Sequence, residues 1–180
     1  ITGECFRGSD PAMQKRGTAK IAEGRSEKAK KSVRMKYELY SGAGNDFVMI
    51  NNFTEGIPFE KQRELTVKLC NENFPKIDGV IFADKPLSES AAVRMNYYNR
   101  DGSFGAMCGN GARCIAMFAF KNGITDKREF TLEAVDDTYT AEILDDEIVR
   151  IGFPEPKEIR ADIRITDETG KPLNVSYANV

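Results

Sequence analysis

The sequence predicts an α/β domain in which β-strands curl around one apolar helix to close a barrel. Strand signals recur from Met35 to about Phe153, as short apolar or alternating runs bounded by turn residues. Between them, residues 110–122 carry a helical stripe of apolar side chains, which Met117 and Phe118 widen nearly all round the helix. Because a helix this apolar must be surrounded by protein, the strands are expected to enclose it.

Four strands and one helix are predicted ahead of the apolar helix. The strands are Met35–Tyr40, Phe47–Asn52, Gly79–Ala83 and Ala92–Tyr98. Residues 41–46, which include two glycines and an Asn-Asp pair, form the turn between the first two strands. Pro58 suits the first turn of a helix that runs to about Asn71. A glycine-rich loop over residues 99–107 then leads into the apolar helix.

The apolar helix is expected to end at Asn122-Gly123, a typical C-cap pair. Short strands separated by turn signals follow it, at Glu129–Ala134, Tyr139–Leu144, Ile148–Phe153 and near Leu173–Val180. The patterned region from residue 35 to residue 153 is therefore predicted to form one domain.

Residues 1–34 differ in composition from the rest of the chain. They hold nine Lys or Arg residues against four Asp or Glu residues, and almost no large apolar side chains. Such a segment cannot bury enough apolar surface to offset its ordering entropy, so it is predicted to be a disordered basic leader. A basic arm for nucleic acid and an organellar transit peptide are two functional interpretations. The favoured one is an extraneous extension, because the chain starts at Ile1 and Met35 opens the first well-patterned strand.

The composition limits the chemistry. The chain of 180 residues contains no histidine, which excludes Ser-His-Asp and Cys-His arrangements and any imidazole base. Its four cysteines are too few for a disulfide scaffold, which favours a reducing cytoplasm. Without a Cys-x-x-Cys pair or histidine ligands, a zinc site is not expected. The longest unbroken apolar run, Cys114–Phe120, is far shorter than the roughly 20 residues of a membrane span. Carboxylate, thiol, amine or backbone groups must therefore carry any reaction.

The most informative stretch is the loop from Asn99 to Arg113, which leads into the apolar helix. It places Cys108 where an irregular glycine-rich loop becomes a helix. At a helix N-terminus, unpaired N–H groups and the positive end of the dipole favour a thiolate, and they also bind a carboxylate or phosphate. Gly109 and Gly111 are expected to let a ligand approach the backbone. The residues alone therefore predict a reactive thiol beside an anion pocket.

The same residue types also allow structural interpretations. A lone cysteine such as Cys108 is more often a small buried hydrophobic residue than a functional one. Cys114, on the apolar helix, and Cys70, at the end of the preceding helix, are expected to lie in the core. The loop at residues 42–47 lacks the third glycine and the following helix of a dinucleotide-binding fingerprint, and residues 109–113 do not match a P-loop. Nucleotide binding is therefore not favoured.

Two longer motifs resemble the N-terminal signatures of the diaminopimelate epimerase family. They are Gly42-Ala43-Gly44-Asn45-Asp46-Phe47-Val48, and Asn99-x-Asp101-Gly102-Ser103 leading into Met107-Cys108-Gly109-Asn110-Gly111-Ala112-Arg113-Cys114. The similarity runs from Met35 to Val180. Related racemases of the same fold are less similar, because the proline racemase group has a histidine after the Cys-Gly and the phenazine-biosynthesis group has no cysteine there.

The resemblance implies a cofactor-independent isomerase that converts LL-2,6-diaminopimelate to the meso form, in lysine and peptidoglycan synthesis. In this family one cysteine thiolate removes the α-proton while a second thiol supplies a proton to the opposite face. Cys108 would be one of this pair. Asn45 and Asn99 would hydrogen-bond the substrate, and Gly109 and Asn110 would bind its α-carboxylate through backbone amides.

The resemblance also implies an architecture and a set of partners. A mixed β barrel around a central helix would be followed by a second, similar domain, for which residues 154–180 would supply a linker and the first strand. The family carries its second catalytic cysteine further on, in a Cys-Gly-Thr-Gly motif, so the chain is expected to be incomplete. In the family's loop before the third strand, only Asp78-Gly79 match, which leaves open a substrate contact at the Gly79 position. A small-molecule substrate is expected, with no cofactor, metal, nucleic acid or membrane partner, and a homodimer is left open.

Three hypotheses of different classes follow. The chain is the N-terminal part of a diaminopimelate epimerase, or of a related cofactor-independent amino-acid racemase. Alternatively, it is a module that binds an amino acid without turnover, because the partner of Cys108 is missing. The third hypothesis is a structural fragment that needs another half to fold.

Overall fold

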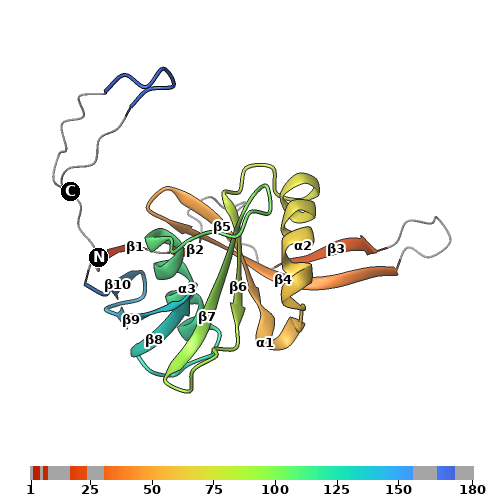
Figure 1. Cartoon of the computed structure of the whole chain (residues 1–180). Helices are drawn as coiled ribbons and strands as arrows, with labels where there is room; N and C mark the ends of the chain where they lie inside the picture. The colour runs from red at the N-terminus through yellow and green to blue at the C-terminus, as the bar shows by residue number, and fades with distance from the viewer. Residues whose placement is uncertain (1, 5, 8–16, 24–30, 156–165, 173–180) are drawn as a thin grey trace.

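The computed structural model describes residues 2–4, 6–7, 17–23, 31–155 and 166–172, and Figure 1 shows a curled sheet that carries helices. The strands are β1 (Thr2–Glu4), β2 (Phe6–Arg7), β3 (Gly17–Glu23), β4 (Lys31–Gly42), β5 (Asn45–Asn51), β6 (Gly79–Asp84), β7 (Ala91–Asn99), β8 (Glu129–Ala134), β9 (Asp137–Ile143) and β10 (Ile148–Gly152). The helices are α1 (Asn52–Glu55), α2 (Phe59–Glu72) and α3 (Gly109–Lys121). The α/β fold predicted from the sequence is confirmed.

The strands form one mixed sheet in the order β1-β10-β9-β8-β7-β6-β5-β4-β2, with β3 paired to β4. The pairs β5–β6 and β7–β8 are parallel, and the other strand pairs are antiparallel. At the two ends of the order, Thr2 pairs with Arg150 of β10, and Phe6 pairs with Ser41 of β4. The short strands β1 and β2 therefore bring both ends of the sheet together.

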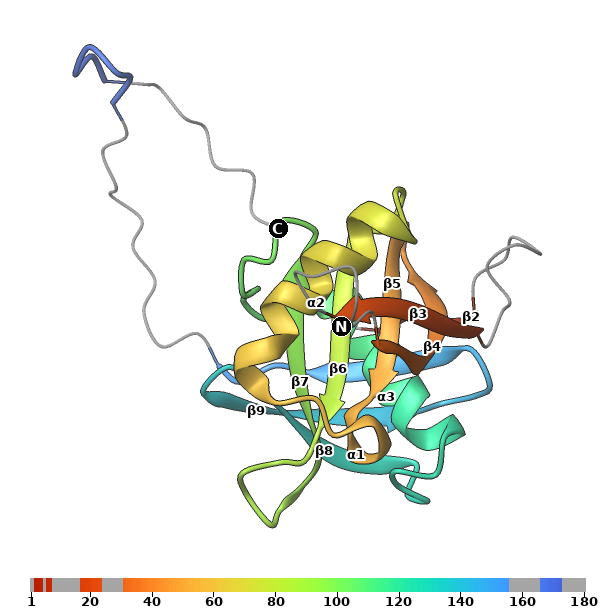
Figure 2. The same cartoon turned by 90° about the vertical axis from the view of Figure 1, so that its right-hand side faces the viewer.

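Helix α3 lies inside the curl of the sheet (Figures 1 and 2). Every residue from Gly111 to Ala119 is buried. Side chains from β4 to β10 pack around it, among them Met49, Ile81 and Met95. This arrangement explains why the helix is apolar nearly all round, and it confirms the prediction that the strands enclose it.

Helix α2 covers the opposite face of the sheet, where a second core forms (Figure 2). Along β5, Phe47 and Met49 belong to the core around α3, whereas Val48 and Ile50 belong to the core that contains Leu69 of α2. Both faces of β5 and β6 are therefore buried, which is why these strands read as continuous apolar runs rather than as alternating ones.

The predicted strands and helices between residues 35 and 153 are present, with small shifts at their ends. The short helix α1 was not predicted. The Oδ1 of Asn51 caps it by accepting a hydrogen bond from Phe53 N at 3.2 Å, and it ends at Gly56, which has a φ of 64°. The strand predicted near Leu173–Val180 lies outside the described residues, and the division into domains stays a prediction.

Part of the segment of residues 1–34 forms strands, where its composition predicts a disordered leader. Strands β1, β2 and β3 lie in it, and β4 begins at Lys31 rather than at Met35. Strand β3 pairs with β4 from Gly17, opposite Tyr37, to Glu23. This ladder is made of backbone hydrogen bonds, which need no large apolar side chains, so composition did not reveal it. The other residues of the segment lie outside the described part of the chain.

Within the described residues, none of the helices has the length and apolar character needed to cross a membrane.

Candidate active site

A two-residue hairpin turn brings Asn45 to the start of α3. The turn connects β4 to β5, and its central residues Ala43 and Gly44 have φ values of 48° and 90°. Positive φ at both positions is typical of the type I′ turn, which matches the twist of the two strands. A Cβ on Gly42 would lie 3.0 Å from the backbone oxygen of Asn110, so only glycine lets the hairpin pack this closely against α3.

Cys108 occupies the N-cap position of α3, where its backbone is extended, with φ −111° and ψ 111°. Its Sγ accepts a hydrogen bond from Gly111 N at 3.4 Å, and its backbone oxygen accepts one from Ala112 N at 2.7 Å. The amides of Gly109 and Asn110 come earlier in the helix, where α-helical geometry offers no carbonyl to bind. A half-buried thiol therefore lies beside backbone donors that have no partner among the described residues.

Gly111 has a different role from the one expected. A Cβ at this position would lie 2.9 Å from the side chains of both Ile81 and Met95. The residue is buried, and glycine here lets the first turn of α3 pack against β6 and β7. Close approach of a ligand to the backbone of Gly111 is therefore excluded by the core.

A chain of hydrogen bonds connects two of the predicted substrate-binding residues to a buried cation. Asn110 Nδ2 donates to Asn45 Oδ1 at 2.7 Å. Arg113 Nη2 donates to Asn110 Oδ1 at 2.6 Å. The side chain of Arg113 is only 4% exposed, although it carries a charge. We refer to Asn45, Asn110 and Arg113 as the amide chain.

Asn99 lies at the end of β7, opposite Gly79 at the start of β6. Its Oδ1 accepts a hydrogen bond from Tyr97 Oη at 2.7 Å, and its Nδ2 donates to Ser103 Oγ at 3.0 Å. The Ser103 backbone amide and hydroxyl both donate to Asp101 Oδ1, at 2.8 and 2.6 Å, and these bonds lower the pKa of that carboxyl. The loop that leads to Cys108 is thus held in shape by its own polar side chains.

Tyr97 connects the Asn99 region to Cys108. Its ring contacts Phe47 edge to face, with centroids 5.7 Å apart. Burial, assisted by the negative charge of an ionised Cys108 and by Asp78, raises the pKa of Tyr97 to about 12. The phenol therefore stays protonated at neutral pH and donates to Asn99, which fixes the direction of the Asn99 amide.

Asp78 and Gly79, the matching pair in the loop before β6, hold the strands together at this end. Asp78 Oδ2 accepts a hydrogen bond from Asp46 N at 2.7 Å, and Asp78 N donates to Asp46 O at 2.9 Å. A Cβ on Gly79 would lie 2.3 Å from the backbone oxygen of Tyr98. The close packing of β6 against β7 therefore accounts for this glycine.

The cysteines of the described region differ sharply in environment. Cys70 and Cys114 are fully buried, as predicted, whereas Cys108 is half-buried. Burial also raises the pKa of the Cys70 thiol, an effect that Arg100 partly opposes. Cys5 lies outside the described residues. Across the described residues, no group of three or more His, Cys, Asp or Glu side chains could hold a metal ion.

The structure brings the five predicted site residues to one end of the sheet. Cys108, Gly109 and Asn110 start α3, and Asn45 contacts Asn110 directly. Asn99 lies at the same end, because Gly79 is its neighbour on β6 and Phe47 of β5 is the neighbour of Gly79.

Sequence reasoning did not single out Arg113 or Tyr97 as parts of this site. Arg113 is the one charged residue between Gly109 and Phe120, and a charge in so apolar a helix is a usable signal. Tyr97 precedes Asn99 by two residues, so the strand period places both on one face of the sheet.

Comparison with known proteins identifies relatives over most of the chain. The family model described as diaminopimelate epimerase matches residues 37–155. A diaminopimelate epimerase of Flavobacterium psychrophilum is 35% identical over 147 residues, which cover 81% of this chain and 56% of that protein. One from Chlorobaculum tepidum is 37% identical over 147 residues, covering 77% of this chain and 56% of that protein. The chain thus spans about half the length of these relatives.

Among solved structures, a hydroxyproline epimerase from Agrobacterium vitis, with bound trans-4-hydroxy-L-proline, has a similar fold. The TM-score is 0.52 at 16% sequence identity, and the match covers 82% of this chain and 46% of that chain. This likeness supports the fold and says nothing of the substrate of the present chain.

Proposed function

Because the chain belongs to the diaminopimelate epimerase family, we propose that it takes part in the cofactor-independent epimerisation of LL-2,6-diaminopimelate to the meso form. The observation that carries the proposal is the position of Cys108 at the N-cap of α3, beside the backbone amides of Gly109 and Asn110, which have no partner within the described part of the chain. The two relatives compared above are longer than the stretch that this chain matches, so the proposal concerns the site that the matched half supplies.

In the proposed mechanism the α-carboxylate of the substrate accepts hydrogen bonds from the amides of Gly109 and Asn110. The helix dipole and these donors stabilise the negative charge that grows as the α-proton leaves. The thiolate of Cys108 takes that proton and becomes a thiol, and the electron pair of the C–H bond stays on the α-carbon. A second acid must then donate a proton to the opposite face of the carbanion.

Neither of the other described cysteines can be that second acid, because Cys70 and Cys114 are fully buried in the two cores. We assign the role of the second acid to a thiol outside the described residues. Cys108 alone supports removal and return of the α-proton on one face, which exchanges the proton with solvent without changing the configuration.

The test is solvent exchange at the α-carbon. LL-diaminopimelate is incubated with the full chain in D₂O, and deuterium uptake is followed by mass spectrometry while chiral chromatography follows the configuration. We expect slow uptake without inversion, and loss of uptake in Cys108→Ser. Cys70→Ala is the matched control and should keep the uptake. Equal uptake in Cys108→Ser and in the wild type would contradict the role of Cys108.

A binding module without turnover is the second candidate, favoured by the single accessible thiol in the described region. It predicts that LL-diaminopimelate binds, in a calorimetric titration, while no deuterium enters it. Running the same titration with L-proline and trans-4-hydroxy-L-proline separates the proposed substrate from those of a related racemase. A cytoplasmic location and a homodimer stay proposals; the sparse cysteines support the first.

A further inference from the structure

Arg113 is a buried cation, and packing in the core does not explain why a charged side chain is present at this position. It lies one turn after Asn110 on α3, and every residue that follows it up to Phe120 is apolar. A Cβ built on Gly3 of β1 would be 3.0 Å from Arg113 Nε, so the guanidinium packs directly against this strand. Nε is buried and has no hydrogen-bond partner among the described residues. Burying a charge without full hydrogen bonding costs free energy, so we infer that Arg113 has a role other than packing.

We propose that Arg113 is a positioning residue, which fixes the direction of the amide chain so that Asn45 presents its NH₂ group to the substrate. The proposal rests on the proposed function, because it assigns the way in which Asn45 meets the ligand.

The direction follows from what each group can donate and accept. A guanidinium has only donors, so Asn110 must turn its Oδ1 toward Arg113. The Nδ2 of Asn110 then points to Asn45, whose Oδ1 must accept the hydrogen bond. The Nδ2 of Asn45 is left without a hydrogen bond to any described residue. Two amides that could each be flipped in isolation are set by one cation.

The orientation selects the chemistry of the ligand. With Nδ2 directed away from Asn110, Asn45 offers two N–H donors, which suit a carboxylate oxygen of the substrate. In the flipped state, Asn45 would offer a carbonyl oxygen, which repels a carboxylate. Together with the amides of Gly109 and Asn110, Asn45 therefore adds a donor at the end of the sheet where the carboxylate is proposed to bind.

The test uses the ¹⁵N-labelled full chain without ligand. Side-chain amide signals of Asn45 and Asn110 are assigned by their loss in Asn45→Asp and Asn110→Asp. In Arg113→Met, which keeps an unbranched side chain but has no donor, we expect solvent exchange of the Asn110 amide to be roughly tenfold faster, because a charge-assisted bond is lost. We also expect the Asn45 signals to shift. Arg113→Lys, which keeps a cationic donor, should restore much of the wild-type exchange rate.

A control separates positioning from general loosening of the core. Ile115→Val removes one methylene from the same helix without touching the amide chain, and it should lower stability while leaving both amide signals unchanged. The proposed role of Arg113 is contradicted if the exchange rates of the Asn45 and Asn110 side-chain amides in Arg113→Met equal those of the wild type. It is also contradicted if Ile115→Val changes these rates as much as Arg113→Met does. Arg113→Met should then weaken LL-diaminopimelate binding, and Arg113→Lys should restore it. If the wild type does not bind this ligand, the proposed function fails, while the exchange rates still decide the role of Arg113.

Discussion

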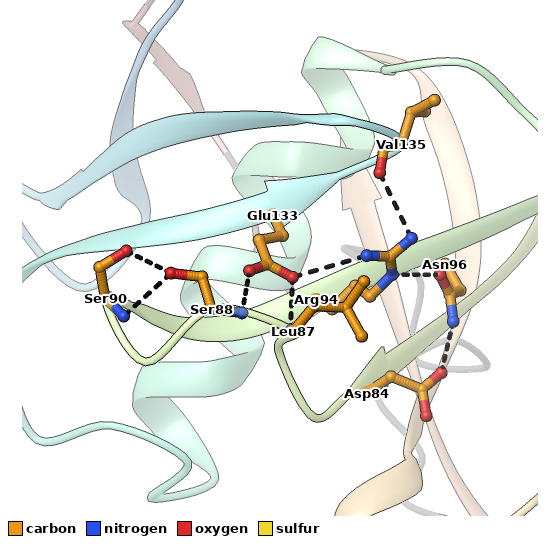
Figure 3. A network of polar contacts seen from close by, with 8 residues as sticks. All are labelled: Asp84, Leu87, Ser88, Ser90, Arg94, Asn96, Glu133 and Val135. Carbon is orange, nitrogen blue, oxygen red and sulfur yellow. Dashed lines mark hydrogen bonds and ion pairs between the residues drawn. The ribbon is translucent and has the colours of Figure 1, made fainter.

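The two ends of strands β5, β6 and β7 carry polar networks of opposite character. At one end, Asp84 and Glu133 lie with Arg94 in a network that surrounds the loop after β6 (Figure 3). At the other end lie Cys108 and the amide chain. Both networks are partly buried, and both combine amides with a cation, so burial and composition do not distinguish them.

The difference lies in what is left unpaired. In the first network both oxygens of each carboxylate accept hydrogen bonds: Asp84 binds Asn52, Gln62 and Asn96, and Glu133 binds Leu87 N and Ser88 N. Arg94 Nη1 lies 3.6 Å from Glu133 Oε2, so the charges of the network also meet (Figure 3).

At the Cys108 end, the groups without a partner among the described residues are the Asn45 NH₂, the backbone amides of Gly109 and Asn110, and Arg113 Nε, all of them donors. The first network satisfies both carboxylates, and the buried group that it leaves without a partner among the described residues is an acceptor, Gln62 Oε1, so it stabilises the fold and offers no donor to an anion. A network that ends in several donors beside a thiol is arranged for an anion.

The largest effect should appear in thiol reactivity. In the native chain at neutral pH, we expect iodoacetamide to modify Cys108 at least about a thousandfold faster than Cys70 or Cys114, because the buried thiols react only after unfolding. Peptide mapping by mass spectrometry measures each cysteine separately, and the same experiment in urea is the control in which the rates converge. Slow modification of Cys108 in the native chain would mean that this end of the sheet is closed as well.

The next effect is on stability and concerns the self-paired network. Glu133→Ala removes the carboxylate that pairs with Arg94 and leaves the backbone amides of Leu87 and Ser88 without their acceptor, so we expect the free energy of unfolding to fall by roughly 2–4 kcal/mol. Glu142→Ala is the matched control. It breaks the exposed ion pair with Arg150, whose atoms are 2.7 Å apart, and should cost less than about 1 kcal/mol. Urea denaturation measures both, and similar losses in the two variants would remove the distinction between the networks.

Whether the sequence could predict each feature depends on how far apart in the chain the interacting residues lie. Local signals sufficed for α3 and for Cys108 at its start, because caps and apolar periodicity act within a few residues. The pairing of β1 with β10 could not be read, because it joins residues about 150 positions apart through backbone atoms. The Asp84 and Glu133 network was missed for the same reason: Glu133 meets Leu87 across 46 residues.

A smaller effect concerns pH. Burial holds the Tyr97 proton in the folded chain up to about 12, whereas an unfolded tyrosine releases it near its ordinary pKa of 10.0. The unfolded state therefore binds fewer protons in this interval, and the free energy of unfolding falls as pH rises from 10.0 toward 12. In Tyr97→Phe this contribution is missing, so its stability should fall less steeply, although the lost bond to Asn99 lowers it at every pH.

Tyr98 provides the control for that experiment, because burial also raises its pKa and its contribution is unchanged in Tyr97→Phe. Urea denaturation of both chains at several pH values gives the two slopes. If the free energy of unfolding fell equally steeply with pH in both chains, burial would not raise the pKa of Tyr97. The end of the sheet near Cys108 would then be more open to water than its hydrogen bonds suggest.

The smallest effects come from the two hairpin turns, one at each end. Val135, in the turn between β8 and β9, has a φ of 56°, and Ala43, in the turn before Asn45, has a φ of 48°. Both conformations cost an L-residue energy, and more so a β-branched one. We expect Val135→Gly to raise the free energy of unfolding by about 1 kcal/mol, and Ala43→Gly to raise it by less, since glycine also loses more entropy on folding.

The backbone oxygen of Val135 accepts a hydrogen bond from Arg94 and is kept in the glycine variant, so the self-paired network should be undisturbed. The turn at Ala43 differs, because it carries Asn45 into the amide chain. Ala43→Gly should therefore leave the free energy of unfolding almost unchanged while it alters the solvent exchange of the Asn45 side-chain amide. Val135→Gly should raise the free energy of unfolding and leave that exchange unchanged. Urea denaturation and amide exchange on the same two variants measure both quantities. If the two variants changed them in the same proportion, the ends of the sheet would not be energetically distinct.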